Sequence, residues 1–354
     1  MSYSKQYLRL LAATQLLPVL ESGEETLVGG QAVLEGVMMR TPHAWGITVR
    51  KPSGELVSHS DVLERPSDKH KWMGWPVVRG VVTLGHAMKI GFRALKFSAD
   101  VALEECCHSE SAVADEESLP SSLSPGVGIP RSARNDKNDK LEISGWMATL
   151  NIIFSLGFFI AVYKFLPLLA TTGLKHEMPS LNNLVLFNIV DGVIRIGLFL
   201  LFVWGIGKAN DIHRVYEYHG AEHKTVFAFE TGDPVDVPRA QSFVTWHPRC
   251  GTSFLMTVMI ICIVVYSLFP ITTFWGKFAL RIIALPFIAG ISYELIRYAA
   301  RKRNSLFALL TLPGLWLQRI TTQGPGDGQV ECAIHALDRA LEVEKQNGGE
   351  LVIA

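Results

Sequence analysis

Four long apolar stretches constrain the fold of this 354-residue chain more than any other feature. A helix needs about 20 predominantly apolar residues to cross the hydrocarbon core of a bilayer. The stretches approach that length, and they cover residues 145–170, 184–206, 253–275 and 278–299. One such stretch could be a buried helix of a soluble protein, but four are too many for the core of a chain this small. The sequence therefore predicts an α-helical integral membrane protein with about four transmembrane helices.

The cations beside these stretches predict which side of the membrane each loop faces, because Lys and Arg are enriched in cytoplasmic loops. They gather before the first stretch, between the second and third, and after the fourth, whereas the two opposite loops hold few. We therefore expect a multi-pass protein of the inner (plasma) membrane. Both termini and the loop of residues 207–252 should face the cytoplasm.

The composition agrees with a membrane location. Hydrophobic residues make up 49% of the chain, and charged residues make up 19%, below the usual quarter or so. The 33 Lys and Arg balance the 33 Asp and Glu, so nothing resembles the basic field of a nucleic-acid binder. The five irregularly spaced cysteines do not form a disulfide framework. The expected partner is the lipid bilayer, and the substrate classes that this location admits are lipids and membrane proteins.

The residues before the first apolar stretch predict a small cytoplasmic α+β unit. Residues 45–59 have the β-branched runs and Gly-containing turn of a hairpin. Residues 29–40 read as one apolar strand, with tight turns at Gly30 and Gly36. Residues 72–102 have the spacing of an amphipathic helix, which could lie on the membrane surface or pack on the strands.

Composition and periodicity divide the chain into seven parts. Residues 104–142 are rich in Ser, acidic residues and Pro, and cannot bury enough apolar area to order themselves. An apolar patch near the start reads as an amphipathic helix more than as a signal peptide, since no small-residue cleavage site follows. The parts are an N-terminal amphipathic helix (1–25), a β-rich unit with an amphipathic helix (26–103), a disordered linker (104–142), a first transmembrane hairpin (143–206), a cytoplasmic metal-site loop (207–252), a second transmembrane hairpin (253–300), and an interfacial segment with a C-terminal cytoplasmic helix (301–354).

The cytoplasmic metal-site loop carries the residues that most indicate chemistry. His219, Glu222 and His223 stand at i, i+3 and i+4, so a helix presents all three on one face. Two imidazoles one turn apart can ligate one metal ion, and a carboxylate beside them can polarise a water there. The order H-x-x-E-H is also that of inverzincin enzymes. The motif predicts a metal centre with Glu222 as its catalytic base.

A second pair of candidate ligands, His247 and Cys250, stands just before the third apolar stretch. Together with His219 and His223 it offers imidazole nitrogens and one thiolate, a set that suits a divalent metal and Zn²⁺ above all. Four protein ligands would close a structural site, whereas three would leave a position open for catalysis. Without a metal, the histidines could bond backbone or lipid phosphate, and Cys250 could pack as a small residue or act as a nucleophile.

Charged residues inside the apolar stretches form a second candidate group. Asp191 and Arg195 stand at i and i+4, where they can neutralise each other. Charges in membrane segments normally face the interior of the bundle or a wet cavity. The pair is therefore either structural or part of a polar cavity that admits a substrate head group or a proton.

Five motifs together give the chain a family resemblance. They are GGQAVLEGVMMR (29–40), YHGAEHKTV (218–226), HPRCGTSFL (247–255), LPGLWLQ (312–318) and TTQGPGDGQVECAI (321–334). With them the chain resembles the YqhQ-like family of bacterial and plastid membrane proteins, a domain of unknown function labelled as a predicted metal-dependent enzyme. The resemblance covers nearly the whole chain. It departs from the family pattern at Gln323, where an acidic residue is expected, and this argues against the loop as a carboxylate donor.

Two functions from different classes follow. The first is an integral-membrane, zinc-dependent hydrolase whose site lies at the cytoplasmic interface of the membrane. The second is a non-enzymatic transporter or assembly factor in which the metal is structural. Glu222 distinguishes them, because a structural site of His and Cys needs no adjacent acid and a hydrolytic site does.

Overall fold

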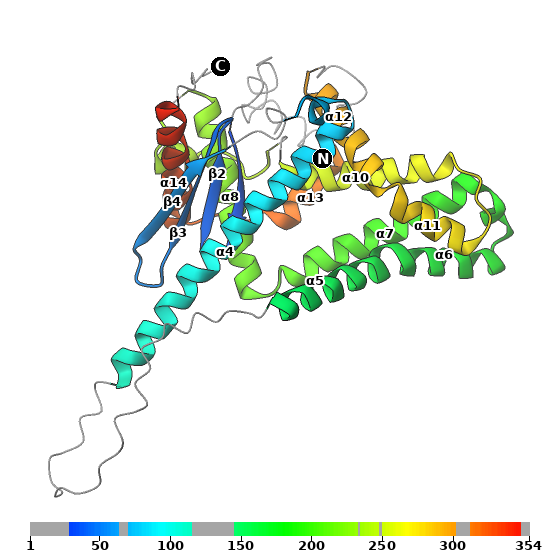
Figure 1. The fold of residues 1–354 in the computed structure, drawn as a ribbon, viewed down its shortest axis with the longest axis horizontal. Helices are drawn as coiled ribbons and strands as arrows, with labels where there is room; N and C mark the ends of the chain where they lie inside the picture. The colour runs from blue at the N-terminus through cyan, green and yellow to red at the C-terminus, as the bar shows by residue number, and fades with distance from the viewer. Residues whose placement is uncertain are drawn as a thin grey trace, which may run out of the picture.

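A computed structural model describes residues 28–63, 70–114, 145–232, 234–247, 250–301 and 312–347. They form a mostly helical protein with one small antiparallel sheet, as predicted (Figure 1). The sheet lies on one side of the molecule, and most of the apolar helices lie on the other (Figure 1). The predicted N-terminal helix (1–25) lies outside the described residues.

The sheet has four strands in sequential order. They are β1 (Gly29–Val33), β2 (Gly36–Arg40), β3 (Ala44–Arg50) and β4 (Leu56–Val62). The predicted hairpin is confirmed as β3 and β4. The segment 29–40 is a hairpin and not the single predicted strand, because the chain turns at Glu35, whose φ is 52°. Gly36 permits the return, since a Cβ there would lie 2.4 Å from the Thr48 carbonyl oxygen.

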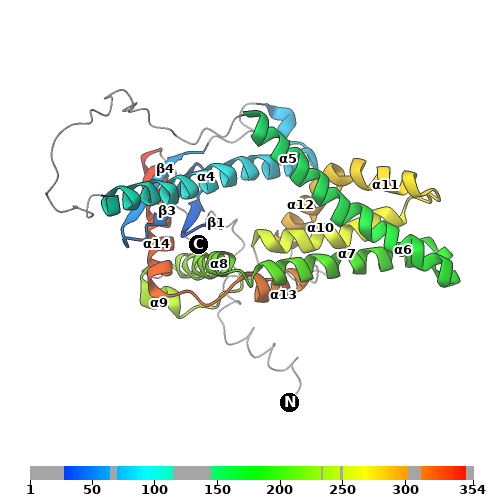
Figure 2. The ribbon, with the colours of Figure 1, turned by 90° about the horizontal axis from the view of Figure 1, so that it is seen from below.

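Helices cover both faces of the sheet. One face carries α4 (Val78–Ala114), which buries Ile90 and Ala94 against it. The other face carries α8 (Asn210–Glu230) and α14 (Asp327–Gln346), which share a core with Val37 and Met39 of β2 (Figure 2). Strands buried on both faces need apolar residues at successive positions. This explains why β2 reads as a continuous apolar run.

Helix α4 is longer than the amphipathic segment predicted from the sequence. It passes the expected boundary at residue 103 and ends at Ala114, so the first residues of the predicted linker are helical. Glu104 and Glu105 are good helix formers and continue the helix begun by the amphipathic segment. Residues 115–142 of that linker lie outside the described residues. At its other end α4 packs on α12 (Leu285–Arg301), where Arg79 pairs with Glu294.

Two of the described helices are long and apolar enough to cross a membrane, or three if one bent pair counts as a span. The first runs over Thr149–Glu177 and the second over Leu184–Ile206. The helices that compose or join them are α5 (Gly145–Ile160), a π-helical turn η2 (Ala161–Phe165), α6 (Leu166–Glu177), a 3₁₀ turn η3 (Pro179–Asn182) and α7 (Leu184–Ile206).

The third and fourth apolar stretches form shorter helices than the sequence predicts. Helix α10 (Gly251–Ser267) has 17 residues and stops before Pro270. At about 1.5 Å per residue it is shorter than the roughly 30 Å hydrocarbon core. The fourth stretch divides into α11 (Phe274–Ile283) and α12, bent by 50° where Pro286 opens the second helix. Proline removes a helical hydrogen bond and crowds the preceding turn, which explains the bend.

The remaining helices are short. They are η1 (Lys71–Gly74), α9 (Val237–Gln241) and α13 (Leu312–Thr321). Of these, α9 packs on α8 and η1 packs on α4. Helix α13 packs on α10 and α7, so the end of the predicted interfacial segment is a helix against the apolar bundle. Helix α8 follows α7 after a three-residue turn. It therefore joins the apolar helices to the sheet unit, and the candidate site lies at this junction.

Candidate metal centre

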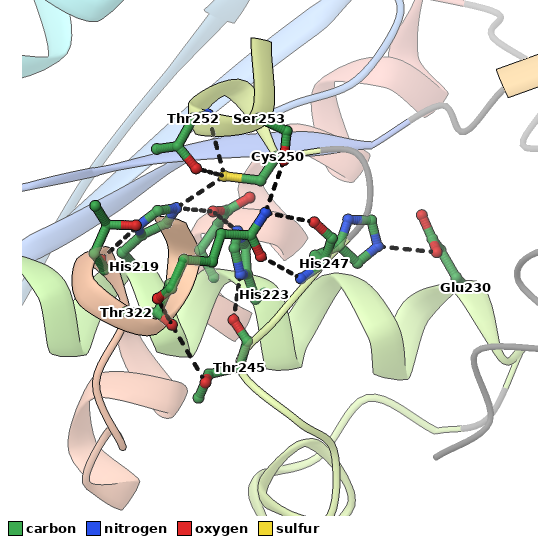
Figure 3. A network of polar contacts seen from close by, with 12 residues as sticks. His219, His223, Glu230, Thr245, His247, Cys250, Thr252, Ser253 and Thr322 are labelled. Atoms are coloured by element: carbon green, nitrogen blue, oxygen red, sulfur yellow. Dashed lines mark hydrogen bonds and ion pairs between the residues drawn. The ribbon is translucent and has the colours of Figure 1, made fainter. Parts of the chain in front are cut away.

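The centre is built from α8, the first residue before α10 and the end of α13 (Figure 3). His219 and His223 lie one turn apart on α8, with ring centroids 4.4 Å apart. Cys250 is the N-cap of α10 and points its sulfur at the same place. One ligand atom from each of these three residues lies within 4.8 Å of the others. His219 and Cys250, 31 positions apart, are thus brought together where the start of α10 meets α8.

The hydrogen bonds of the two histidines fix which ring nitrogen faces the centre. His219 donates Nδ1–H to the Thr321 carbonyl at 2.8 Å, and His223 donates Nδ1–H to the Thr245 carbonyl at 2.5 Å. A carbonyl accepts only, so each Nδ1 carries a proton, and Nε2 is the ring nitrogen that faces the centre and could bind an ion. The Nε2 of His223 is buried and has no hydrogen-bond partner among the described residues. Metal-ligating histidines are oriented in this way.

The spacing of the ligand atoms fits a tetrahedral ion. Zinc bonds of about 2.0–2.3 Å place ligand atoms roughly 3.3–3.7 Å apart. His219 Nε2 lies 3.1 Å from Cys250 Sγ, and all three ligand atoms lie within 4.8 Å of one another. Shifts of a few tenths of an ångström to about 1 Å bring them to zinc geometry. Three protein ligands leave the fourth position open.

The electrostatics of the centre favour a thiolate at Cys250. Burial alone would raise its pKa, but the two imidazoles lower the pKa of Cys250 well below its usual range. Its sulfur also lies 3.5 Å from the Thr252 amide nitrogen and 3.1 Å from the Thr252 hydroxyl, at the positive end of α10. Burial opposes charge on His223, yet the Cys250 sulfur and the Glu222 carboxylate raise the pKa of His223 to about 9. Metal binding would therefore displace a proton from His223.

Glu222 lies beside the centre without being one of the three grouped ligands. Its Oε2 is 3.6 Å from His223 Nε2 and 4.0 Å from His219 Nε2, and its side chain is only 8% exposed. Arg40 of β2 is close enough for its charge to interact with this carboxylate. This position suits a base that acts on a molecule at the fourth coordination position, which the three protein ligands leave open. His219, with 13% of its side chain exposed, forms the more open side of the centre.

His247 stands apart from the other three predicted ligands. Its Nε2 lies 3.3 Å from Glu230 Oε2, and both side chains are buried (Figure 3). Its ring centroid is 5.8 Å from that of His223 and 4.5 Å from that of Phe227. The geometry thus brings together His219, His223 and Cys250 and gives His247 a different, acidic partner.

Gln318 of α13 holds the loop that presents Cys250, and sequence reasoning missed it. Its side chain accepts from the His247 amide at 2.7 Å, donates to the His247 carbonyl at 2.8 Å, and donates to the Ser253 hydroxyl at 3.1 Å. These bonds fix the chain on both sides of Cys250. The only signal was the place of Gln318 at the end of the motif LPGLWLQ.

The end of α13 contributes a backbone carbonyl to the centre, and the loop that follows it packs on α8. Thr321, at the start of TTQGPGDGQ, supplies the oxygen that orients His219. The Gln323 amide donates to the Tyr216 carbonyl at 2.9 Å. A Cβ at Gly220 would lie 2.1 Å from the Gln323 carbonyl oxygen, so this glycine lets the loop reach α8. The lack of an acid at Gln323 does not affect this role.

Gly30 also serves the centre, although the sequence reads it as a turn. A Cβ there would lie 2.6 Å from Glu222 Cγ, 2.8 Å from the Met38 carbonyl oxygen and 2.8 Å from Met39 Sδ. The backbone oxygen cannot move freely, so the glycine allows Glu222 to lie directly on β1. The neighbouring Gly29 has room for a side chain, since a Cβ there would meet only Arg40 Nε, at 3.9 Å.

Gly30→Ala should therefore lower the thermal unfolding midpoint of the purified protein, because overpacking of this kind costs about 1–3 kcal/mol. Gly29→Ala is the matched control. It makes the same change one residue away in the same strand, and it should leave the midpoint unchanged or slightly raised. Equal midpoints for the two variants would show that Glu222 does not pack on β1 as described.

Two comparisons with known proteins agree on one family. Residues 75–343 match the model described as "Protein of unknown function (DUF1385)". The "Uncharacterized protein YqhQ" of Bacillus subtilis (strain 168) is 30% identical over 322 residues, which cover 89% of this chain and 92% of that protein. No solved structure matches the chain at a significant level.

Proposed function

The chain belongs to the family of proteins of unknown function DUF1385, and we propose that it is an integral-membrane, zinc-dependent hydrolase whose site lies at the cytoplasmic interface of the membrane. Family membership confirms the resemblance seen in the motifs. The membrane location, the metal and the reaction are proposals that rest on the site and its surroundings.

The observation that carries the proposal is the convergence of three ligand atoms beside a buried acid. His219, His223 and Cys250 would hold the ion, with each imidazole oriented by a backbone carbonyl. When bound, zinc with one open position supplies Lewis-acid activation of water. Glu222 Oε2 then accepts a proton at the centre, and Arg40 offers positive charge near it.

The surroundings of the site support a position at the membrane surface. Cys250 immediately precedes the apolar helix α10, and α8 follows the apolar helix α7. Helix α5 exposes large apolar side chains, which in water would be an unfavourable surface. The most exposed include Leu150, Ile153, Phe154 and Phe158.

Helix α4 also offers a surface for lipid. Met88, Phe92 and Leu95 are exposed and follow one another at helical spacing, opposite the residues that pack on the sheet. Exposed cations stand beside them at Lys89, Arg93 and Lys96. An apolar stripe flanked by basic residues is typical of a helix at an anionic membrane surface. We therefore propose the bilayer as a partner and a lipid or membrane protein as the substrate.

Cobalt substitution tests the proposed ligand set directly. Protein loaded with Co²⁺ should show the near-ultraviolet charge-transfer band of a cobalt–thiolate bond. Cys250→Ser should lose that band, because the sulfur is removed and a weak oxygen donor takes its place. Cys332→Ser is a control, since Cys332 is a buried free cysteine that donates to the Thr48 carbonyl. Persistence of the band in Cys250→Ser would exclude Cys250 as a ligand.

A second candidate rests on the 3.1 Å separation of His219 Nε2 and Cys250 Sγ. A thiolate beside an oriented imidazole can act as a nucleophile without a metal. The cobalt experiment separates the two functions, because a nucleophile site would bind no stoichiometric cobalt and would instead be alkylated at Cys250 by iodoacetamide. A structural metal in a transporter or assembly factor is the third candidate. The Glu222→Gln variant distinguishes it from a hydrolase, because a structural site needs no catalytic base.

A further inference from the structure

A separate cluster of buried charged side chains lies among the apolar helices. Its members are Asp191 and Arg195 of α7, Arg281 of α11 and Lys164 of the π-helical turn η2. All four residues are at most 6% exposed. The cluster holds three cationic side chains and one carboxylate. Even with Lys164 neutral, two guanidiniums, which stay charged in proteins, face one acid.

The single carboxylate is shared between the two arginines. Arg195 donates to Asp191 Oδ2 at 2.5 Å, which confirms the predicted pair. Arg281, which the sequence did not connect with this pair, places a terminal nitrogen 3.1 Å from Asp191 Oδ1, without the geometry of a hydrogen bond. The ring of Tyr266 lies 5.5 Å from each guanidinium carbon and partly offsets their charge.

Several donors of the cluster remain unsatisfied. Arg195 Nε, one terminal nitrogen of Arg195 and one of Arg281 are buried and have no hydrogen-bond partner among the described residues. Buried charge that is neither paired nor hydrogen-bonded is strongly disfavoured, and more so between apolar helices. The unsatisfied donors belong to the two residues whose charge exceeds that of Asp191. An added anion would both balance the excess positive charge and accept hydrogen bonds from these donors.

A small cavity touches this cluster at Arg281. Polar side chains of Asn188, Tyr266, Lys277 and Arg281 line it, together with apolar residues of the surrounding helices. It has room for about one particle the size of water. Lys277 adds a further cation to its wall. The size excludes a phosphate head group, and the positive lining disfavours a metal cation.

From this arrangement we infer that the protein binds a small inorganic anion of the size of chloride between Arg195 and Arg281, in a site reached through this cavity. Asp191 competes with the anion for the same two guanidiniums. The site is independent of the proposed metal centre, because it uses none of that centre's residues. It would neutralise the helix bundle and couple its stability to the anion.

Thermal unfolding of the full-length protein in nanodiscs tests this inference. Replacing sodium gluconate by sodium chloride at constant ionic strength should raise the unfolding midpoint of the wild type in a saturable manner, since a ligand that binds only the folded state stabilises it. Asp191→Asn removes a competing negative charge and should lower the apparent dissociation constant for chloride by about tenfold or more. Arg281→Gln should lose the dependence on chloride.

Controls separate this site from other effects of salt. Arg319→Gln changes a cation that stacks on Trp246 and Trp316 outside the cluster, and it should keep the wild-type response. If Arg281→Gln does not fold, chloride binding can be measured by the broadening of the ³⁵Cl resonance. The wild type should broaden it, and Asp191→Asn should do so at lower chloride concentration. Equal midpoints in chloride and gluconate, or a response in Asp191→Asn alone, would overturn the inference. A response to phosphatidylglycerol with none to chloride would overturn it too.

Discussion

Purified protein with His223→Ala is expected to contain almost no zinc, whereas His247→Ala is expected to contain as much as the wild type. The two substitutions remove the same side chain from buried positions, with 1% and 4% of the residue exposed. They differ in where the ring points. His223 Nε2 faces Cys250 and Glu222 with no hydrogen-bond partner, and His247 Nε2 faces Glu230. Both substitutions remove a buried ring, but only His223→Ala removes a nitrogen that faces the centre, so the metal content should differ.

The expected size of the difference follows from coordination. Changing a residue that only orients a ligand typically weakens metal affinity about 10–100-fold, and the loss of one of three ligands should weaken it more. Elemental analysis of protein purified without chelator should give about one zinc per chain for the wild type and for His247→Ala. Zinc retained by His223→Ala and lost from His247→Ala would reverse the ligand assignment. Wild-type protein without metal would end the metal hypothesis.

The sequence could not choose between His247 and Cys250, since both stand within ligand distance by spacing alone. The choice is made by contacts from distant parts of the chain. Gln318, 71 residues from His247, bonds the His247 backbone and fixes the loop. Glu230 then takes the His247 ring. Periodicity did predict that His219 and His223 share a face, because both stand on one helix and need no long-range contact.

The hairpin of β1 and β2 was missed for a similar reason. Turns with positive φ usually hold Gly or Asn, and here Glu35 takes that conformation. Long-range contacts hold it there. Arg214 of α8 donates twice to the Glu35 carboxylate, each at 2.5 Å, and the Arg50 amide donates to the Glu35 carbonyl at 2.8 Å. The β3–β4 hairpin, whose turn contains Gly54 with a φ of 91°, could be predicted from local residues.

The apolar stretches show which membrane features composition predicts. Hydrophobicity located the helices, and two of them have the length of a span. It did not reveal that Pro270 follows a helix of only 17 residues, or that the bend beside Pro286 divides the fourth stretch. Whether this bent pair forms one span depends on how it packs, and packing is not encoded in hydrophobicity alone.

Glu222→Gln should keep the zinc and the fold and lose hydrolysis, measured with the chromogenic ester p-nitrophenyl acetate. The amide preserves the size of the side chain but cannot accept a proton, and a general base typically contributes about 10²–10⁴-fold to the rate. We therefore expect the zinc-dependent rate to fall by that factor. Glu230→Gln is the matched control, because Glu230 is a buried acid on the same helix, with 6% side-chain exposure against 8% for Glu222.

The possible results of this comparison separate the functions that the site admits. A loss of rate with zinc retained in Glu222→Gln, and an unchanged rate in Glu230→Gln, is the result expected of a hydrolase. Loss of zinc from Glu222→Gln would make Glu222 a ligand or a group that orients one, since its Oε2 lies 3.6 Å from His223 Nε2. A wild-type rate in Glu222→Gln, or no zinc-dependent rate in the wild type, would favour a structural metal. The acid would then serve only to offset the positive charge of the metal ion.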